Sequence, residues 1–295
     1  MLAIHGIIPP VITPMQANEE LDLSRLCRFL DYQINAGVHA LFVLGTNSEA
    51  YALDDREKQE LLATAVSHVN RRKPVVAGTG APTTRETIRL TKLAEKEGVD
   101  AVTVITPYYI SPAQHELMDH YRRVAEATSL PVMLYNNPAH TGGLKLNPDT
   151  VARLAEIPNI VAIKDSSGDL QNTLDYLRLV PKTFAVLQGR DTLIWPSLQF
   201  GCAGAVPASA NVAPQICVEI YEAFRRGDQV AAKAAQLRLN PVRQSLMLAT
   251  PPGGPKAALK ILGMDMGPCR APVGPLSPEK EKQMRQVLRE ANLLT

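Results

Sequence analysis

One lysine in the chain stands where nucleophilic chemistry is expected. Lys164 directly follows the apolar run IVAI and precedes the polar run DSSGD. Burial at the end of a strand disfavours the charged ammonium of a lysine and leaves an amine that can form a Schiff base with a carbonyl compound. The alternative is a solvent-exposed lysine paired with Asp165, and the position in the sequence does not decide between the two.

Hydroxyl groups and a glycine-containing loop follow other apolar runs. Tyr135 ends the run VMLY, and its phenol could pass a proton to a carbinolamine or an imine. Thr46 and Tyr109 could extend a relay of hydroxyls toward solvent. The backbone N–H groups of Gly45, Thr46 and Asn47 could bind a carboxylate. Each of these residues is ordinary on its own, so a site requires that they converge on Lys164.

Metal, phosphate-loop and serine-hydrolase chemistry find little support in the sequence. His115 and His120 are five residues apart, so they do not share a helix face as the two histidines of a zinc-protease helix do. The four other histidines form no cluster in the sequence, and neither a Walker A sequence nor Gly-x-Ser-x-Gly is present. We therefore expect no metal ion and no cofactor.

Eight short apolar runs predict the strands that must position these residues. The runs are near-continuous, as in parallel strands covered on both faces, and amphipathic helical segments separate them. Eight such units favour an α/β fold, the (β/α)₈ TIM barrel of ~250 residues, over a doubly wound sheet, whose glycine fingerprint fails at Thr83. The expected strands cover residues 6–12, 39–44, 74–78, 101–105, 131–135, 160–164, 184–188 and 203–206.

In such a barrel the functional groups gather at the carboxyl ends of the strands, so the lysine, the tyrosine and the hydroxyls would meet at one mouth. Capping-box spacing marks expected helix starts at Asp54, Thr83 and Ser111. Past residue 227 the pattern predicts helices only. We therefore expect a barrel over residues 1–227 that carries the active site, and a C-terminal helical appendage over residues 228–295.

Composition excludes several classes of partner. The 31 Lys and Arg residues nearly balance the 29 Asp and Glu residues, and aromatic residues make up only 5%, so we expect no nucleic-acid partner. No run of about 18 apolar residues is present, and the N-terminal segment lacks the basic region of a signal peptide, so we expect no membrane partner. Four widely spaced cysteines are typical of a reducing compartment, and the expected location is the cytoplasm.

Four motifs in register with the expected strand ends resemble those of one enzyme family. They are GTNSE at 45–49, TPYY at 106–109, YNNP at 135–138 and IKDSSGD at 163–169. Together they resemble the dihydrodipicolinate synthase / N-acetylneuraminate lyase family of class I, Schiff-base aldolases. The resemblance covers essentially the whole chain.

The resemblance implies a role for each matching residue. Lys164 would condense with the ketone of a 2-oxo acid, typically pyruvate or a pyruvate-yielding substrate, and Tyr135 would move protons during imine formation and C–C bond chemistry. Thr46 and Tyr109 would form the relay, with Tyr109 reaching into a neighbouring subunit of a homotetramer built as a dimer of dimers. The positions that the resemblance assigns to the substrate are Thr46 and Asn47, which would hold its carboxylate, and Gly189 and Val206, which would line the pyruvate pocket.

Three departures from the family pattern bear on the substrate. Where family members that make dihydrodipicolinate carry an arginine for the semialdehyde carboxylate, this chain has His140, which replaces a permanent bidentate cation by an imidazole. The carboxylate loop has Asn47 for a threonine and Ser48 for a glycine. The positions that match the lysine-feedback site are not those of the feedback-regulated members, so the resemblance does not predict feedback by lysine; they hold Asp55, Lys58 and Pro82.

The sequence therefore predicts a Schiff-base-forming lyase that acts on pyruvate or a pyruvate-yielding 2-oxo acid, with preference for a sugar-derived or hydroxylated one. One alternative is a genuine 4-hydroxy-tetrahydrodipicolinate synthase of lysine biosynthesis. An alternative of another class is a catalytically silent regulatory protein that binds a 2-oxo acid. The complete set of candidate catalytic residues disfavours the silent protein, because a pure binder has no use for a proton relay.

Overall fold

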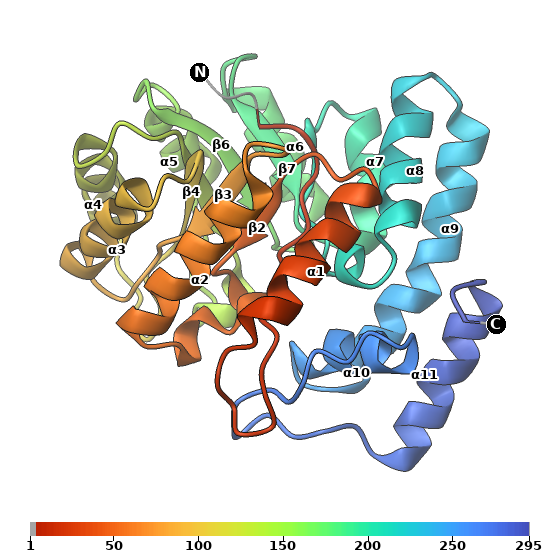
Figure 1. Ribbon diagram of the computed structural model, residues 1–295. Coiled ribbons are helices and arrows are strands. Elements are labelled where there is room, and N and C mark those ends of the chain that lie inside the picture. Colours follow the sequence, from red (N-terminus) through yellow and green to blue (C-terminus); the bar gives the residue numbers. More distant parts are fainter. Residues whose placement is uncertain (1–3, 295) are drawn as a thin grey trace.

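A closed barrel of parallel strands forms the centre of the molecule (Figure 1). Within residues 4–294, which the computed structural model describes, eight parallel strands form one sheet in the order β1-β8-β7-β6-β5-β4-β3-β2. Backbone hydrogen bonds from Phe42 N to Pro9 O (3.0 Å) and from Val11 N to Phe42 O (2.7 Å) join the two ends of this sheet. The expected (β/α)₈ barrel is confirmed. Its strands are β1 (Gly6–Ile7), β2 (Leu41–Val43), β3 (Val75–Gly78), β4 (Ala101–Ile105), β5 (Val132–Asn136), β6 (Ile160–Asp165), β7 (Ala185–Gln188) and β8 (Gly204–Ala205).

Helices cover the outside of the barrel and continue past it (Figure 1). The helices that follow the strands are α1 (Leu23–Asn35), α2 (Asp55–Val69), α3 (Thr84–Lys96), α4 (Gln114–Glu126), α5 (Pro148–Leu154), α6 (Leu170–Leu179), α7 (Ile194–Gln199) and α8 (Pro214–Arg225). The C-terminal part holds α9 (Gln229–Ser245), α10 (Gly253–Ile261) and α11 (Pro278–Glu290). None of the helices described is long and apolar enough to cross a membrane.

Two local expectations differ from the structure. The first strand is shorter than residues 6–12 because Pro9 and Pro10 have no N–H group to donate to a neighbouring strand. Helix α4 begins three residues after the expected cap Ser111, because the Glu116 carboxylate accepts a hydrogen bond from Ala113 N (2.7 Å) and so makes Ala113 the cap. The other two expected starts, at Asp54 and Thr83, are confirmed by their side-chain bonds to the first turn.

The barrel interior is filled by side chains that alternate along the strands. Phe42, Met133, Ala162 and Leu187 belong to one buried apolar cluster inside the sheet. Residues two positions further along a strand point to the same side. The side chains that follow Met133 and Ala162 by two positions therefore also face the interior, at the carboxyl end of the barrel.

The C-terminal helices are tied to the loop that follows β2. Lys256 of α10 and Glu49 form an ion pair of 2.7 Å, and both side chains are almost fully buried. Arg270 donates from its backbone N to the second Glu49 oxygen (2.9 Å) and from its guanidinium to Glu57 of α2 (2.7 Å). Removal of one partner of a buried pair costs about 3–5 kcal/mol of stability, so these contacts hold the loop firmly. The division into two parts at residue 227 stays a prediction.

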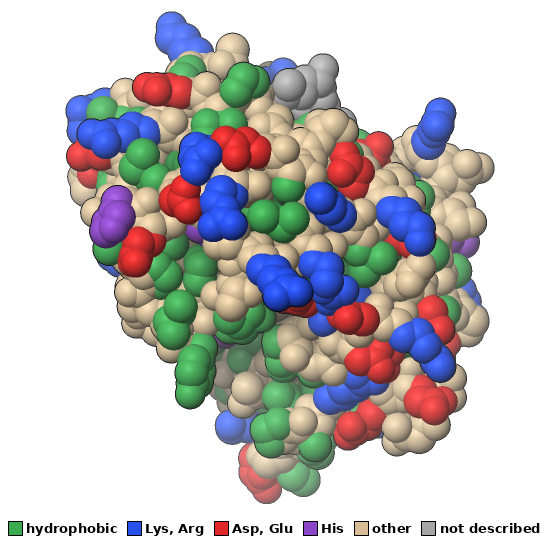
Figure 2. Space-filling model, turned by 90° about the vertical axis from the view of Figure 1, so that its left-hand side faces the viewer, with side chains coloured by type: hydrophobic (Ala, Val, Ile, Leu, Met, Phe, Trp, Pro, Cys, Tyr) green, Lys and Arg blue, Asp and Glu red, His purple; other side chains and the backbone are tan. Residues whose placement is uncertain are grey.

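Charges of both signs are mixed on the surface. On the face shown in Figure 2, Lys and Arg side chains lie among Asp and Glu side chains and do not gather into one stripe. Nucleic-acid binders carry such a stripe along the binding face.

Candidate active site

Lys164 and Tyr135 meet inside the barrel because their strands are neighbours in register. Lys164 of β6 pairs with Tyr135 of β5 in the parallel ladder, and both side chains follow interior residues by two positions. The Lys164 Nζ lies 4.1 Å from the centroid of the Tyr135 ring and 5.2 Å from that of Phe42. Only 4% of Lys164 is exposed. The amine is therefore enclosed by aromatic rings at the bottom of the mouth.

Asp165 does not pair with this lysine. Its side chain is fully buried on the opposite face of the strand, where it accepts hydrogen bonds from Asn136 Nδ2 (2.9 Å) and Thr173 Oγ1 (2.8 Å). The alternative of a solvent-exposed Lys164–Asp165 pair is therefore wrong. The carboxylate instead anchors the end of β6 to β5 and to α6.

The Tyr135 hydroxyl lies in a polar network. Asn137 Nδ2 donates a hydrogen bond to it (2.8 Å), and Thr46, Lys164 and Ser166 are further hydrogen-bonding neighbours. Burial raises the pKa of the Tyr135 phenol, but the nearby Lys164 cation and the hydrogen bonds outweigh it, so the net shift is downward. A buried phenol with a lowered pKa can both give up and take back a proton.

A small cavity of about 80 Å³ opens directly at the Lys164 amine. Thr46 and Asn47 line it from a single 3₁₀ turn, Thr46–Ser48, whose first N–H groups have no acceptor within the turn. Gly189 also lines the cavity, and a side chain is excluded at this position because a Cβ would lie 2.0 Å from the Ser166 Oγ. Val206 and His140 line this cavity as well, so all five residues expected to bind the substrate border it.

A second cavity of about 370 Å³ continues from the first. The two share Thr46, Tyr135 and His140, so they form one mouth. His140 lies at the rim. Partial burial and the positive charges of Arg190 and Lys164 lower its pKa. The imidazole is therefore neutral at pH 7.

Tyr109 is the one expected catalytic residue that the structure does not bring to the site of its own chain. Its side chain is 98% exposed, and its φ of +77° is unusual for a residue with a bulky side chain. Tyr108, the neighbouring residue, lines the larger cavity instead. Tyr109 thus projects away from the chain beside its own mouth.

Several residues at the mouth were not among the sequence candidates. Asn137 and Ser166 lie inside the quoted motifs, so their proximity to Tyr135 and Lys164 could have marked them. Arg190 follows the expected seventh strand, and this position was the only feature of the sequence that could have marked it as a site residue. Residues of the C-terminal part had no such signal, because they come from a segment far away in the sequence; those that line the two cavities are Arg243, Leu246, Thr250, Pro251, Pro255 and Val273.

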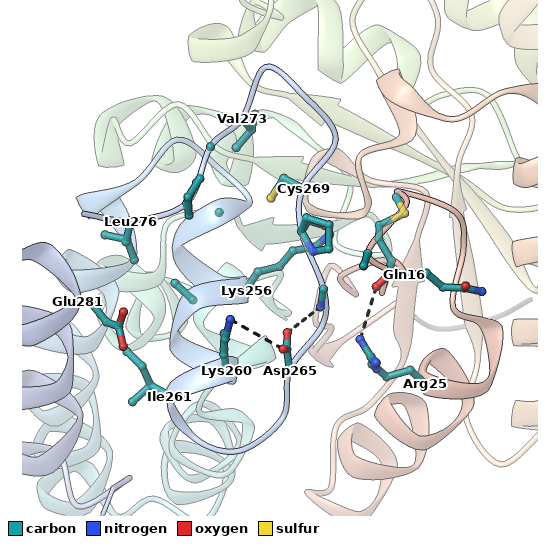
Figure 3. A pocket seen from close by; sticks show the side chains of 18 residues that line it. Gln16, Arg25, Lys256, Lys260, Ile261, Asp265, Cys269, Val273, Leu276 and Glu281 are labelled. Atoms are coloured by element: carbon teal, nitrogen blue, oxygen red, sulfur yellow. Dashed lines mark hydrogen bonds and ion pairs between the residues drawn. The ribbon is translucent and has the colours of Figure 1, made fainter. Parts of the chain in front are cut away.

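A larger cavity of about 490 Å³ lies elsewhere, between the N-terminal segment and the C-terminal helices (Figure 3). Neither Lys164 nor Tyr135 lines it. Two of its charged groups have partners: Lys260 pairs with Asp265 (4.0 Å), and Arg25 donates to the Met15 carbonyl (3.4 Å). The two lysines that line this cavity, Lys256 and Lys260, are both ion-paired. Across residues 4–294, no group of three or more His, Cys, Asp and Glu side chains could hold a metal ion.

Comparison with known proteins agrees with this geometry. Residues 3–291 match the model of the dihydrodipicolinate synthetase family. The chain is 40% identical over 292 residues to a 4-hydroxy-tetrahydrodipicolinate synthase of Methanothrix thermoacetophila, with 99% of this chain and 98% of the relative covered. It is 39% identical over 293 residues to an uncharacterized DapA-like lyase of Halobacterium salinarum, with 99% and 96% covered.

Solved structures show the same fold. The dihydrodipicolinate synthase DapA-2 of Bacillus anthracis matches with a TM-score of 0.95 and 37% identity, over 98% of this chain and 99% of that one. YagE of E. coli K12, a prophage protein solved in complex with pyruvate, matches with a TM-score of 0.95 and 35% identity, over 99% and 100%. The chain therefore belongs to the dihydrodipicolinate synthetase family, whose members are class I lyases that form a Schiff base between a lysine and pyruvate.

Proposed function

We propose that the chain makes or breaks the C–C bond next to a 2-oxo group, or eliminates water there, through a Schiff base between Lys164 and pyruvate or a pyruvate-yielding 2-oxo acid. One observation carries this proposal: a buried amine stands 4.1 Å from the ring of a buried tyrosine, at the bottom of a small cavity. The chemistry needs no metal ion and no cofactor, because the protonated imine itself withdraws electrons from the neighbouring carbon.

The residues at the mouth support each step. The N–H groups of Thr46 and Asn47 hold the substrate carboxylate. The Lys164 amine adds to the C2 carbonyl carbon, and Tyr135 delivers the proton that lets the carbinolamine oxygen leave as water. In the condensation direction, C3 of the resulting imine loses a proton. In the cleavage direction the C3–C4 bond breaks while the C4 hydroxyl gives its proton to the Tyr135 phenolate, so that C4 leaves as an aldehyde. Either route leaves an enamine. Protonation of C3 and hydrolysis then release pyruvate and restore the amine.

The substrate we favour is a sugar-derived or hydroxylated 2-oxo acid. His140 lines both cavities, and its lowered pKa makes the imidazole neutral at pH 7. A neutral imidazole exchanges hydrogen bonds with a hydroxyl group but supplies no charge to a carboxylate. A second candidate, a 4-hydroxy-tetrahydrodipicolinate synthase, is favoured by the names of relatives that are 40% identical. A silent regulatory protein is disfavoured because Lys164, Tyr135 and Thr46 line one cavity.

Measurement of pyruvate release and consumption across a panel of 2-oxo acids and aldehydes tests this proposal. We expect pyruvate release from hydroxylated 2-oxo acids, with a higher kcat/KM than for the condensation of pyruvate with aspartate semialdehyde. A higher efficiency with aspartate semialdehyde would establish the second candidate. Absence of any turnover, with binding of a 2-oxo acid retained, would establish the regulatory protein.

Replacement of His140 by arginine should improve the use of aspartate semialdehyde. A guanidinium restores a permanent cation and a bidentate hydrogen bond, each bond worth about 1.5–3 kcal/mol, so kcat/KM for the semialdehyde should rise about 10- to 100-fold in His140→Arg. The comparison is made by steady-state kinetics on both proteins. An efficient wild type that His140→Arg does not improve would mean that another residue holds the carboxylate.

Replacement of Tyr109 by phenylalanine should lower kcat by about 10- to 100-fold with little change in KM, because it removes a proton-transferring hydroxyl and leaves substrate contacts intact. The full exposure of Tyr109 supports a role in the mouth of a neighbouring copy, within the homotetramer that we propose. Activity then requires at least a dimer. Light scattering alongside kinetics checks both points, and a fully active monomer would contradict the proposal.

We also place the protein in the cytoplasm. Within the described part of the chain all four cysteines are free thiols, and three of them are buried. Burial raises the pKa of Cys202 to about 12 and that of Cys269 to about 11. These cysteines therefore act as small apolar residues, which supports a reducing compartment.

A further inference from the structure

Arg190 is a cation without a partner at the catalytic mouth. It lines the same small cavity as Lys164 and is partly buried. Among residues 4–294, no carboxylate lies within 4.0 Å of its guanidinium nitrogens, and its Nε atom is buried without a hydrogen-bond partner. An unpaired donor in such a place costs free energy unless a ligand supplies the acceptor.

The Arg190 side chain packs over the loop that follows β6, at the edge of the small cavity. Arg190 is the second residue after β7, behind Gly189, and its backbone N donates to Gln188 Oε1 (2.8 Å). Its side chain lies along the loop after β6: a Cβ on Gly168 would stand 3.0 Å from Nε and 3.6 Å from Cζ. Because Gly168 has no Cβ and a φ of +79°, the loop after Lys164 leaves room for the guanidinium.

The other charged groups of the cavity leave Arg190 free. Asp191 is buried and accepts hydrogen bonds from Ser209 N (2.6 Å) and Ala208 N (3.3 Å), and Arg243 stands 3.7 Å from it. Lys164, Arg190 and Arg243 are thus the three cations of the cavity, and Asp191 is its one carboxylate among the described residues. Once Lys164 has formed its imine with the 2-oxo group, Arg190 still has no anionic partner within the chain.

We propose that Arg190 binds a carboxylate at the far end of the substrate, so that the preferred 2-oxo acid carries two carboxylates. This inference rests on the proposed Schiff base at Lys164. The planar fork of a guanidinium matches a carboxylate in two parallel hydrogen bonds. The positive charge of Arg190 also reaches His140 on the opposite rim, where it contributes to the lowered pKa of the imidazole.

Arg190 is not a substitute for an arginine at position 140. The two residues follow β7 and β5, which flank β6 on opposite sides, so their strand ends are about 10 Å apart. A carboxylate held by Arg190 therefore lies on the other side of the Lys164 amine. His140 remains opposite, where it can contact a hydroxyl on the chain between the two carboxylates.

Trapping of 2-oxo acids on Lys164 tests the assignment without a need for turnover. Borohydride supplies the hydride that converts each imine into a stable secondary amine, and mass spectrometry of peptides reports the adduct on Lys164. Two pairs of acids differ only in a terminal carboxylate or methyl group: 2-oxoglutarate with 2-oxopentanoate, and 2-oxoadipate with 2-oxohexanoate. The quantity measured is the concentration of each acid at half-maximal trapping.

In the wild type we expect at least one of the two dicarboxylates, 2-oxoglutarate or 2-oxoadipate, to be trapped at a concentration about 10- to 100-fold lower than its methyl-ended partner. This is the effect of one bidentate charged contact. Arg190→Gln should reduce this ratio to near one, and Arg190→Lys should keep part of it, because lysine retains the charge but not the fork. Arg226→Gln is the matched control, since it removes an exposed arginine at the end of α8 and should keep the wild-type ratio.

Pyruvate trapping on the wild type separates the two levels of the proposal. Absence of a pyruvate adduct on Lys164 would overturn the proposed function. A pyruvate adduct together with equal trapping of the two acids of each pair, or with a preference that survives in Arg190→Gln, would overturn the role of Arg190 alone. The role of Arg190 would also be overturned if none of the four longer acids were trapped or competed with pyruvate. An equal weakening of trapping for both acids of a pair in Arg190→Gln would overturn it too.

Discussion

Pyruvate and borohydride together should add a reduced three-carbon unit to Lys164, and Lys164→Ala should lose turnover by about 10⁴-fold or more, as removal of a covalent nucleophile does in other enzymes. The expectation follows from geometry. Among the described residues Lys164 is the only lysine that lines the small cavity, and its amine lies against two aromatic rings, which exclude water from it. Peptide mass spectrometry locates the adduct, and steady-state kinetics measures the loss.

Two further variants make this result specific. Lys164→Arg keeps a positive charge in the cavity but cannot form an imine, so it should be as inactive as Lys164→Ala. Lys182→Ala removes an exposed lysine and should be trapped and active like the wild type. Circular dichroism checks that Lys164→Ala remains folded, because this side chain stands at the mouth and not within the apolar core. An adduct on a different lysine would refute the mechanism.

Tyr135→Phe should lower kcat by about 10²- to 10⁴-fold, the range in which a positioned proton donor contributes. The phenol is buried beside the Lys164 amine, and Asn137 donates to its oxygen at 2.8 Å, so the hydroxyl is fixed at the place where the carbinolamine must lose water. Rapid-mixing measurement of imine formation, together with kcat, should show that formation of the Schiff base itself becomes slow. Tyr108→Phe is the matched control at the same mouth and should change kcat far less.

The pH profile offers a second readout of the same residue. The Lys164 cation and the neighbouring hydrogen bonds lower the pKa of Tyr135, so the phenol loses its proton below the ordinary value of about 10. Activity should therefore fall on the alkaline side at a lower pH than that value. Thr46→Val removes a hydrogen bond that favours the phenolate, which raises the pKa of Tyr135, so the fall should move to higher pH. An unchanged profile in Thr46→Val would contradict the contact between these hydroxyls.

The order of elements and the position of the candidate nucleophile were within reach of sequence reasoning. Parallel strands buried on both faces need continuous apolar runs, and each run is short enough to be recognised by itself. The polar residues that interrupt the barrel pattern at strand ends, Lys164 and Tyr135, are conspicuous for the same reason. Their pairing in register then follows from two neighbouring strands of one parallel sheet.

Sequence signals for the ends of helices and strands were less reliable where nearby residues can each set the boundary. Ser111 and Glu116 both lie near the start of α4, and the carboxylate prevailed because it reaches the backbone N–H of Ala113. Pro9 and Pro10 shortened the first strand although the surrounding residues are apolar. Such outcomes depend on single hydrogen bonds, which composition and periodicity do not describe.

The tertiary structure determines which groups surround the mouth formed by the two cavities and how these groups are paired. Glu49 and Lys256 are far apart in the chain, yet they form the buried pair that holds the loop after β2, with Thr46 and Asn47, against α10. The sequence shows that Arg190 follows a strand, but it does not show that Arg190 lacks a carboxylate partner. That depends on the room that Gly168 leaves for its side chain, and on the hydrogen bond that Asp191 accepts from Ser209. The reason is physical: periodicity encodes which face of an element is buried, whereas the partners of a charged group are set by segments that only closure of the barrel brings together.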